Sequence, residues 1–429
     1  MAMLFLLIAL LVFCLIGVPL AFAIGGSSVA YLLTSAPQFL SMIPQRVWNG
    51  AFSDLMIAMP LFILAGELMN IGGITQRIID FCLYIVRPFR GGLGEVTVVA
   101  SMIFGGISGS SVADTSALGS ILIPSMEKKG YPPKVAAGIT VASSTVGMII
   151  PPSVPMIVFS MVSGASVGAL FLAGAVPGIL IGLTQLVVVY LISRKKGYHP
   201  TRTPFDAKDF IHTVLIGLPA ILMPIIIIVC IAGGVCTATE SAGIAVLYAL
   251  LLGFLFYREL TVKAVIESLK KTLVSSASIM IIIGFSTIFT WIMTIEQVPD
   301  QVAALFTQVN LPVWGIALLF DLIILLTGFF IDVTPAILLL CPILLPIIRA
   351  TGIGDLQFGA MVIVGLAIGL VTPPVGMCLN ACNKINGMSI VKIFQGALPY
   401  LLCNVLVLLC ISLFPTVTTW LPSVLGMAS

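Results

Sequence analysis

The chain has 429 residues, of which 60% are hydrophobic and only 8% are charged, and its mean hydropathy is +1.23. Because soluble domains carry about 25% charged residues, this composition indicates an integral membrane protein. The net charge of +3 does not indicate a nucleic-acid partner, and two histidines with nine scattered cysteines support neither a haem, a zinc site nor disulfides.

Apolar stretches long enough to cross a bilayer as helices recur along the chain, and the alternating short strands of a membrane barrel are not seen. The first stretch, residues 1–33, has no positively charged segment before it, so we interpret it as a retained span and not as a secretory signal. Others lie at residues 167–192, 214–232 and 398–414. The sequence therefore predicts an all-α polytopic membrane protein.

The basic residues indicate which ends of the spans lie in the cytoplasm. We place the most basic loop, residues 194–208, inside, and following the spans from it puts Arg46 and Arg349 outside. The nineteen basic residues less these two leave seventeen inside, with the amino terminus inside and the carboxy terminus outside. Residues 260–273 have the pattern of an amphipathic helix lying along the interface, although a solvated linker fits them as well.

Two stretches of the chain repeat one another at an offset of 222 residues, which is 328 minus 106. GGISGSSVADTSALGSILIPSM (105–126) aligns without gaps with TGFFIDVTPAILLLCPILLPII (327–348). Glycine and proline fix backbone geometry, so the halves are expected to share a backbone. The distribution of basic residues places the start of one copy outside the membrane and the start of the other inside. This predicts inverted repeats, which are the architecture of secondary transporters. The matched pairs are Gly106 with Gly328, Pro124 with Pro346, Gly130 with Gly352, Gly147 with Gly369, Pro151 and Pro152 with Pro373 and Pro374, Gly174 with Gly396, and Pro177 with Pro399.

Each copy is expected to contain a re-entrant hairpin. In the first copy, Arg87 and Arg90 lie inside, as do Lys128 and Lys129, and the apolar chain between them is short for two full crossings of about 20 residues each with a turn. Backbone amides at membrane depth must be bonded, so the turn, near residues 108–111, is predicted to line a cavity or be buried. The second hairpin is expected at residues 311–348, with its turn near residues 330–335.

Adjacent prolines are expected to break a helix in each copy. Pro151 has no N–H, so the Gly147 carbonyl loses its helical partner, and Pro152 frees the carbonyl of the next residue. Pro373 and Pro374 do the same in the second copy. Freed carbonyls inside a membrane suit a hard cation such as sodium, and the alternative is a plain proline kink bonded to water and neighbouring groups. The symmetry of the two breaks favours cation sites.

These motifs resemble the large membrane subunit of tripartite ATP-independent periplasmic (TRAP) transporters. The resemblance is carried by GISGSSVADTSALGSILIPSMEKKGYPP, FILAGELMNIGGITQRI, CTATESA around Glu240, GFFIDVTPAILLLCPILLPI and GLVTPPVGM, and it spans nearly the whole chain. It implies a sodium-coupled, elevator-type importer of organic acids in the bacterial inner membrane. It also implies two partners, a small four-helix membrane subunit on a separate chain and a soluble periplasmic substrate-binding protein.

Carried onto this chain, the resemblance implies two sodium sites built largely from backbone groups. The substrate is expected between the hairpin tips, where half-helix amino termini favour a carboxylate. Asp332 repels an anion unless sodium intervenes, so it fits a coupling or structural role as readily as a ligand. Asp114 is either a functional acid or a cap of the second hairpin helix. The first sodium site would use Gly106, Ser110, Gly147, Ile150 and Pro152; the second would use Gly328, Gly369, Thr372 and Val375; the substrate would contact Ser108, Ser110, Ser111, Asp332 and Thr334.

This interpretation divides the chain into two copies of a transport unit separated and preceded by scaffold segments. The expected parts are an amino-terminal scaffold span at residues 1–50, repeat 1 at 51–190, a cytoplasmic loop with scaffold spans and the amphipathic arm at 191–272, repeat 2 at 273–415, and a carboxy-terminal tail at 416–429.

Three other functions fit parts of the pattern. A stand-alone sodium/dicarboxylate symporter has a similar inverted-repeat architecture, and a passive channel is a further alternative. An intramembrane aspartyl protease would need Asp321 and Asp332 as a dyad, but eleven residues of helix separate them by about 16 Å, and GFFID departs from the GxGD pattern. Among substrates, sialic acid is the leading candidate and a C4-dicarboxylate the next, although no residue selects between them.

Overall fold

The structure is a computed structural model that describes residues 2–52, 54–86, 92–198, 207–299, 301–302 and 312–427. Within these ranges the chain forms helices and no strand, which confirms the predicted all-α class. Six of the described helices are long and apolar enough to cross a membrane. They are Val167–Lys196, Thr213–Ala232, Ala238–Phe256, Val262–Ile295, Val333–Thr351 and Ile390–Leu413.

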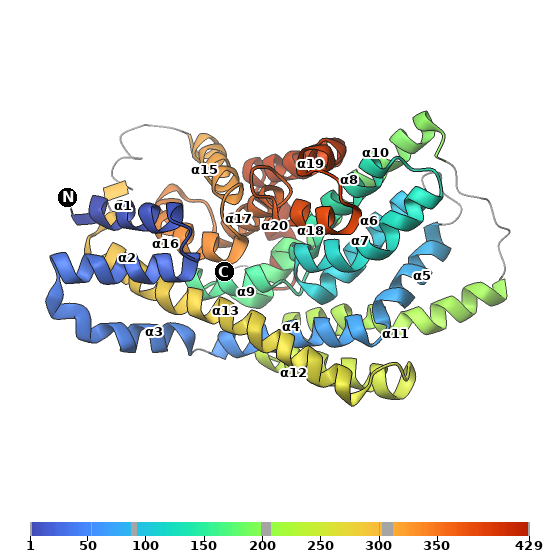
Figure 1. Cartoon of the computed structure of the whole chain (residues 1–429), viewed down its shortest axis with the longest axis horizontal. Helices are drawn as coiled ribbons and strands as arrows, with labels where there is room; N and C mark the ends of the chain where they lie inside the picture. Colours follow the sequence, from blue (N-terminus) through green and yellow to red (C-terminus); the bar gives the residue numbers. More distant parts are fainter. Residues whose placement is uncertain are drawn as a thin grey trace.

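A layer of helices lies along the long helix α13, which spans Val262–Ile295 and follows the long axis of the molecule (Figure 1). Helices α2, α3 and α4 pack directly against α13, while α12 packs on α4 and α11 on α5. Small residues allow the closest approach, because a Cβ atom at Gly50 of α3 would lie 2.1 Å from the Thr287 hydroxyl of α13. The other helices of this part are α1 (Ala2–Leu15), α2 (Leu20–Ser35), η1 (Pro37–Met42), α3 (Ile43–Ala51), α4 (Asp54–Ile71), α5 (Ile74–Val86), α11 (Ala207–Ala232), α12 (Ala238–Leu251) and η3 (Leu252–Phe256).

Residues 262–273 do form helix, but the prediction of a separate amphipathic helix is wrong. The Thr261 side chain caps the helix by accepting a hydrogen bond from the Ala264 amide, and the helix then continues without interruption to Ile295. The physical reason is that neither glycine nor proline occurs between Val262 and Gly284, so nothing ends the helix before the apolar span begins.

The hairpins and broken helices form a compact cluster beside this layer (Figure 1). Subtracting 222 from the first residues of α15, α16, α17, α18 and α19 gives 91, 111, 133, 155 and 168, and the matching helices of the first copy begin at 92, 111, 133, 154 and 167. The bounds are α6 (Gly92–Ser108), α7 (Ser111–Lys128), α8 (Pro133–Ser144), η2 (Thr145–Met148), α9 (Val154–Ser163), α10 (Val167–Lys196), α15 (Val313–Gly328), α16 (Val333–Thr351), α17 (Asp355–Gly369), α18 (Met377–Asn386), α19 (Ile390–Leu413) and α20 (Thr416–Val424).

Both predicted turns and both predicted breaks are observed. The chain turns between α6 and α7 at residues 109–110 and between α15 and α16 at residues 329–332. It leaves helical geometry between η2 and α9 and between α17 and α18, and the bonds Pro151–Pro152 and Pro373–Pro374 are cis. Arg87, Arg90, Leu311 and residues 199–206 of the basic loop lie outside the described residues.

The two hairpins differ in their internal packing. Helix α6 packs along α7, whereas α15 packs on α17 and has little contact with α16. Each copy instead packs a hairpin helix on a half-helix of the other copy, α16 on α9 and α7 on α18. This exchange brings the two hairpin tips and the two broken helices to one place in the molecule.

Candidate functional site

The first hairpin tip is held closed by its own polar groups. The Ser108 hydroxyl donates a hydrogen bond to an Asp114 carboxylate oxygen, and the Ser110 amide donates one to Ser108 Oγ at 3.2 Å. Ser110 is the N-cap of α7, and its side chain accepts from the Ala113 amide at 3.4 Å. Gly109 has a φ of +60° and lies against the Pro152 carbonyl, so the turn needs a residue without a side chain here. The tip is thereby fixed against the first helix break.

The second hairpin tip carries an acid at the matching position. Asp332 is the N-cap of α16, as Ser110 is of α7, since 332 minus 222 is 110. Its side chain makes no capping hydrogen bond and is exposed, so it is available to a ligand. The tip contacts the second break through a hydrogen bond of 3.4 Å from the Val375 amide to the Phe329 carbonyl.

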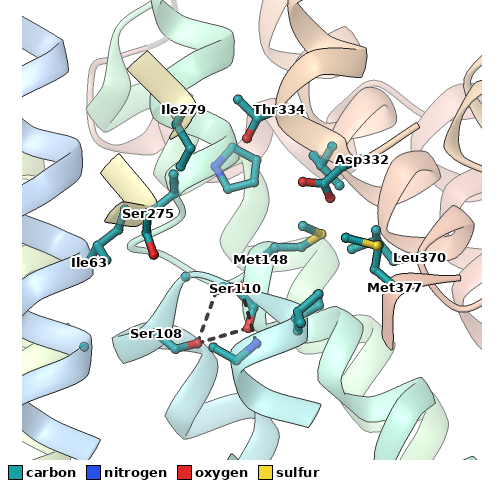
Figure 2. Close-up of a pocket in the computed structure, with 18 of the residues that line it drawn as sticks. Ile63, Ser108, Ser110, Met148, Ser275, Ile279, Asp332, Thr334, Leu370 and Met377 are labelled. Atoms are coloured by element: carbon teal, nitrogen blue, oxygen red, sulfur yellow. Dashed lines mark hydrogen bonds between the residues drawn. The ribbon is translucent and has the colours of Figure 1, made fainter. Parts of the chain in front are cut away.

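A cavity of about 360 Å³ lies between the two tips. Figure 2 shows Ser108 and Ser110 on one side of this space and Asp332 and Thr334 on the other. Because α7 and α16 both begin at the tips, the partially positive amino termini of two helices meet at the cavity. The structure brings together all five predicted substrate residues, which are Ser108, Ser110, Ser111, Asp332 and Thr334.

One wall of the cavity comes from helices that the sequence analysis left out of the site. Ser275 and Ile279 of α13 line it, as do Glu67 and Asn70 of α4. Glu67 also pairs with Lys271 at 3.8 Å. These residues lie outside the stretches in which glycine and proline match between the copies, so the only signal in the sequence was a few polar side chains in apolar helices. Of the two carboxylates in the cavity, Glu67 is paired with Lys271, whereas Asp332 forms no ion pair among the described residues. An organic anion beside Asp332 therefore needs a compensating positive charge.

The first broken helix lies against a buried carboxylate. Asp114 has no exposed surface, and its Oδ2 has no hydrogen-bond partner among the described residues. That oxygen faces the break, because a Cβ atom at Gly147 would lie 1.9 Å from it. The Ser111 hydroxyl, three residues earlier on the same helix face, is also buried and without a partner. Two unsatisfied oxygens beside a helix break fit a hard cation.

Of the predicted residues of the first sodium site, Gly147 lies against this carboxylate, and the others lie at the hairpin tip or at the break. Gly106 lies against the Pro151 carbonyl, at 3.0 Å from a Cβ built on it. Ser110 opens α7 one turn from Asp114, whereas the side chain of Ile150 packs on Gly178 and leaves only its backbone for the site. Asp114 was not among the sodium ligands predicted from the sequence, but its carboxylate is the charged group that faces this break.

The predicted residues of the second sodium site also contact one another. A Cβ atom at Gly369 would lie 2.4 Å from the Gly328 backbone, so α15 and α17 touch there. The Thr372 amide donates to the Gly369 carbonyl at 3.0 Å, and Val375 links the break to the hairpin tip. None of Gly328, Gly369, Thr372 and Val375 lines the cavity between the tips.

Three of the four carbonyls freed by the prolines have partners, which corrects the sequence expectation for Met148, Gly369 and Leu370. The Gly369 carbonyl is bonded as described, and the Leu370 carbonyl accepts from the Cys378 amide at 3.1 Å. The Met148 carbonyl accepts from the Ser153 hydroxyl at 2.5 Å. A carbonyl oxygen has two lone pairs, so each keeps one for a cation, but the bonds hold both breaks in shape without one.

Asp321 and Asp332 do not share a helix. Asp321 lies within α15 and accepts a hydrogen bond of 2.6 Å from the Ser412 hydroxyl of α19, while Asp332 follows the turn and opens α16. The helical spacing assumed for them in the sequence analysis is therefore wrong, because α15 ends at Gly328.

The fold defines a multi-pass helical membrane protein with a cavity between its hairpin tips. The architecture is similar to the crystal structure of the YdaH transporter from Alcanivorax borkumensis, with a TM-score of 0.65 at 15% identity, covering 92% of this chain and 90% of that one. At this identity the likeness concerns the fold alone.

The particular family follows from the sequence. Residues 7–417 match the model of the tripartite ATP-independent periplasmic transporter, DctM component, and the chain belongs to this family. It is a TRAP transporter large permease, and such subunits are transporters and not enzymes.

Three relatives show the breadth of the family. The chain is 39% identical to the uncharacterized protein YgiK of Salmonella typhimurium, covering 95% of this chain and 94% of that protein. It is 36% identical to the sialic acid TRAP transporter large permease SiaM of Vibrio cholerae and 34% identical to the C4-dicarboxylate TRAP transporter large permease DctM of Pseudomonas aeruginosa. The match covers 95% of this chain and 95% of the relative in both cases.

Proposed function

We propose that this chain imports an organic acid by sodium-coupled secondary transport, and that the acid binds in the cavity between the hairpin tips. The observation that carries the proposal is the meeting of both tips beside the buried, unpartnered oxygen of Asp114. The relatives named for sialic acid and C4-dicarboxylates support a carboxylate substrate. Sialic acid is our leading candidate and a C4-dicarboxylate the next.

Sodium supplies the positive charge that the cavity lacks. One ion bound against Asp114 and the Gly147 break satisfies the orphaned carboxylate oxygen, and a second ion at Gly328, Gly369, Thr372 and Val375 lies behind Asp332. With both ions bound, the substrate carboxylate faces two helix amino termini instead of uncompensated acids. The acid then binds with sodium and poorly without it, which is the condition for coupling.

We propose an elevator mechanism with two inverted repeats. The helices at residues 92–196 and 313–413 form the moving part. This division is narrower than the expected transport units at 51–190 and 273–415, because α4 and α13 join α2, α3, α11 and α12 in the scaffold. The cavity supports this division, because its lining comes from both parts, with the hairpin tips facing Ser275 and Ile279 of α13. A sliding motion at this boundary carries the cavity from one side of the membrane to the other.

Two partners follow from the family. TRAP large permeases imply a periplasmic substrate-binding protein and a small membrane subunit. We propose that both serve this chain in a bacterial inner membrane, with the small subunit on a separate chain and the binding protein delivering the acid.

Uptake into proteoliposomes tests the proposal. The large and small subunits are reconstituted together, the binding protein is added outside, and labelled N-acetylneuraminate or succinate is followed with an inward sodium gradient or with equal sodium on both sides. We expect accumulation above the external concentration only with the gradient. Accumulation without sodium contradicts coupling, equilibration alone indicates a channel, and uptake by the large subunit without partners indicates a stand-alone symporter.

A further inference from the structure

A second cavity, of about 490 Å³, lies elsewhere on the boundary between α13 and the hairpin cluster. Helices α3 and α13 supply one wall, and Met161 and Val162 of α9 with Leu338 and Pro342 of α16 supply the other. The apolar side is the hairpin cluster, and the polar side is the α3–α13 layer. The polar groups are those of Arg46, Asn49, Ser286, Thr287, Thr290 and Thr294.

Arg46 is the positive charge of this cavity. Its guanidinium carbon lies 5.0 Å from the centre of the Trp291 ring, so the indole holds it in place. Arg77 and Arg349 are each neutralised by a carboxylate at 2.6 Å, whereas no acidic group in the described part of the chain forms an ion pair with Arg46. A positioned guanidinium without an anion is ready to bind a carboxylate through two parallel hydrogen bonds.

Ser286 gives an independent sign of a ligand. Its side chain is 1% exposed and lines the cavity, yet its hydroxyl has no hydrogen-bond partner among the described residues. A buried hydroxyl without a partner costs free energy unless a bound group satisfies it. Asn49, on α3 beside Arg46, adds an amide donor to the same space.

The two cavities lie in series along one boundary. On α13, Ser275 lines the first cavity and Ser286 the second, and these eleven residues of helix correspond to about 16 Å. The other two helices show the same order along the chain. On α9, residues 154–155 line the first cavity and 161–162 the second. At the start of α16, residues 332–334 line the first cavity, and residues 338 and 342 line the second. Lys270 and Lys271 lie in the first third of α13, on the side that the distribution of basic residues places in the cytoplasm, so the second cavity lies toward the outer side.

We infer that the second cavity is a carboxylate-binding site that holds the organic acid between the outer side and the hairpin cavity. Arg46 binds the carboxylate, and Ser286 and Asn49 donate to its remaining polar groups. The site rests on the proposed function for the identity of its ligand, but its binding requires neither sodium nor movement of the hairpins.

Trp291 reports on this site directly. The chain has four tryptophans, and Trp48, Trp314 and Trp420 are all more than half exposed, so replacing these three with phenylalanine leaves Trp291 as the sole indole. The full-length chain is placed in phosphatidylcholine nanodiscs without sodium, and its fluorescence is titrated with succinate and with N-acetylneuraminate. A carboxylate that draws Arg46 away from the ring changes the emission.

We expect a saturable change with at least one of the two acids. Arg46→Gln is expected to raise the half-saturating concentration about tenfold or more, which is the loss of one charge-assisted contact, and Arg46→Lys to raise it less. Lys270→Gln removes the same charge from an exposed position on α13 and is the matched control, with no expected effect.

Other outcomes overturn the inference. If neither acid causes a saturable change in fluorescence in a folded protein that retains Arg46, the proposed site does not exist. A change caused by phosphatidylglycerol in the nanodisc but not by the acids makes Arg46 a lipid-headgroup site instead. The result is independent of the uptake assay, so a chain that fails to accumulate acid with sodium but shows the Arg46-dependent change loses only the proposed coupling.

Discussion

At the scale of single residues, a substitution of Asp114 tests whether this carboxylate binds a cation or has a structural role. Asp114 and Asp321 are both buried, and each accepts a serine hydroxyl on one carboxylate oxygen and has no partner among the described residues on the other. Asp114 faces the break at Gly147, whereas Asp321 lies within α15. If Asp114 holds sodium, Asp114→Asn removes a charged ligand worth about 1.5–3 kcal/mol and raises the half-saturating sodium concentration for uptake roughly tenfold or more. Asp321→Asn is the matched control, and equal sodium titrations in both variants would contradict the site.

A substitution of Asp332 tests whether this residue is needed to cap helix α16 or to bind the ligand. Serine is a good N-cap, and the matching residue of the first hairpin is Ser110, so Asp332→Ser preserves any capping role. Because the Asp332 side chain makes no capping bond, we expect the free energy of unfolding to change by less than about 0.5 kcal/mol. The rate of uptake is expected to fall at least about tenfold. Lost stability with normal uptake by the folded fraction would make Asp332 structural.

At the scale of elements, the hairpins and broken helices meet through backbone contacts. A Cβ atom at Gly369 would lie 2.4 Å from the Gly328 backbone, which cannot give way like a side chain, whereas one at Gly354 meets nothing within 4 Å. Gly369→Ala is therefore expected to destabilise the chain by about 1–3 kcal/mol, and Gly354→Ala to have little effect. Thermal unfolding in detergent measures both, and equal midpoints would disprove the close contact.

The sequence predicted those elements that glycine and proline define. The tips at residues 108–111 and 330–335 and the breaks after Gly147 and Gly369 are found at those places, because these residues fix local geometry and occur in register in both copies. It did not predict the contact of Asp114 with Gly147, which joins two helices. It also missed the α13 wall of the cavity, which lies outside the stretches in which glycine and proline match between the copies. The continuity of α13 was missed because the change from polar to apolar side chains at residue 273 suggested a boundary that the backbone does not make.

At the scale of the whole molecule, inverted repeats predict that equivalent ends of the two hairpins face opposite compartments. Glu127 is the last but one residue of α7 and Ala350 the last but one of α16, and both side chains are exposed. With the exposed Cys14 and Cys410 replaced by serine, cysteines at 127 and 350 are expected to react with an impermeant thiol reagent from opposite sides. A cysteine at Lys195 marks the cytoplasmic side, and labelling of all three from that side would refute the inverted topology.

The most direct test of the account is an experimental structure of the large and small subunits together, determined with sodium and the transported acid bound. We predict the acid's carboxylate between Ser110 and Asp332 and a cation within about 2.5 Å of Asp114 Oδ2 at the first break. An acid bound outside the cavity of the hairpin tips, or a bound acid with no cation at either break, would contradict the account.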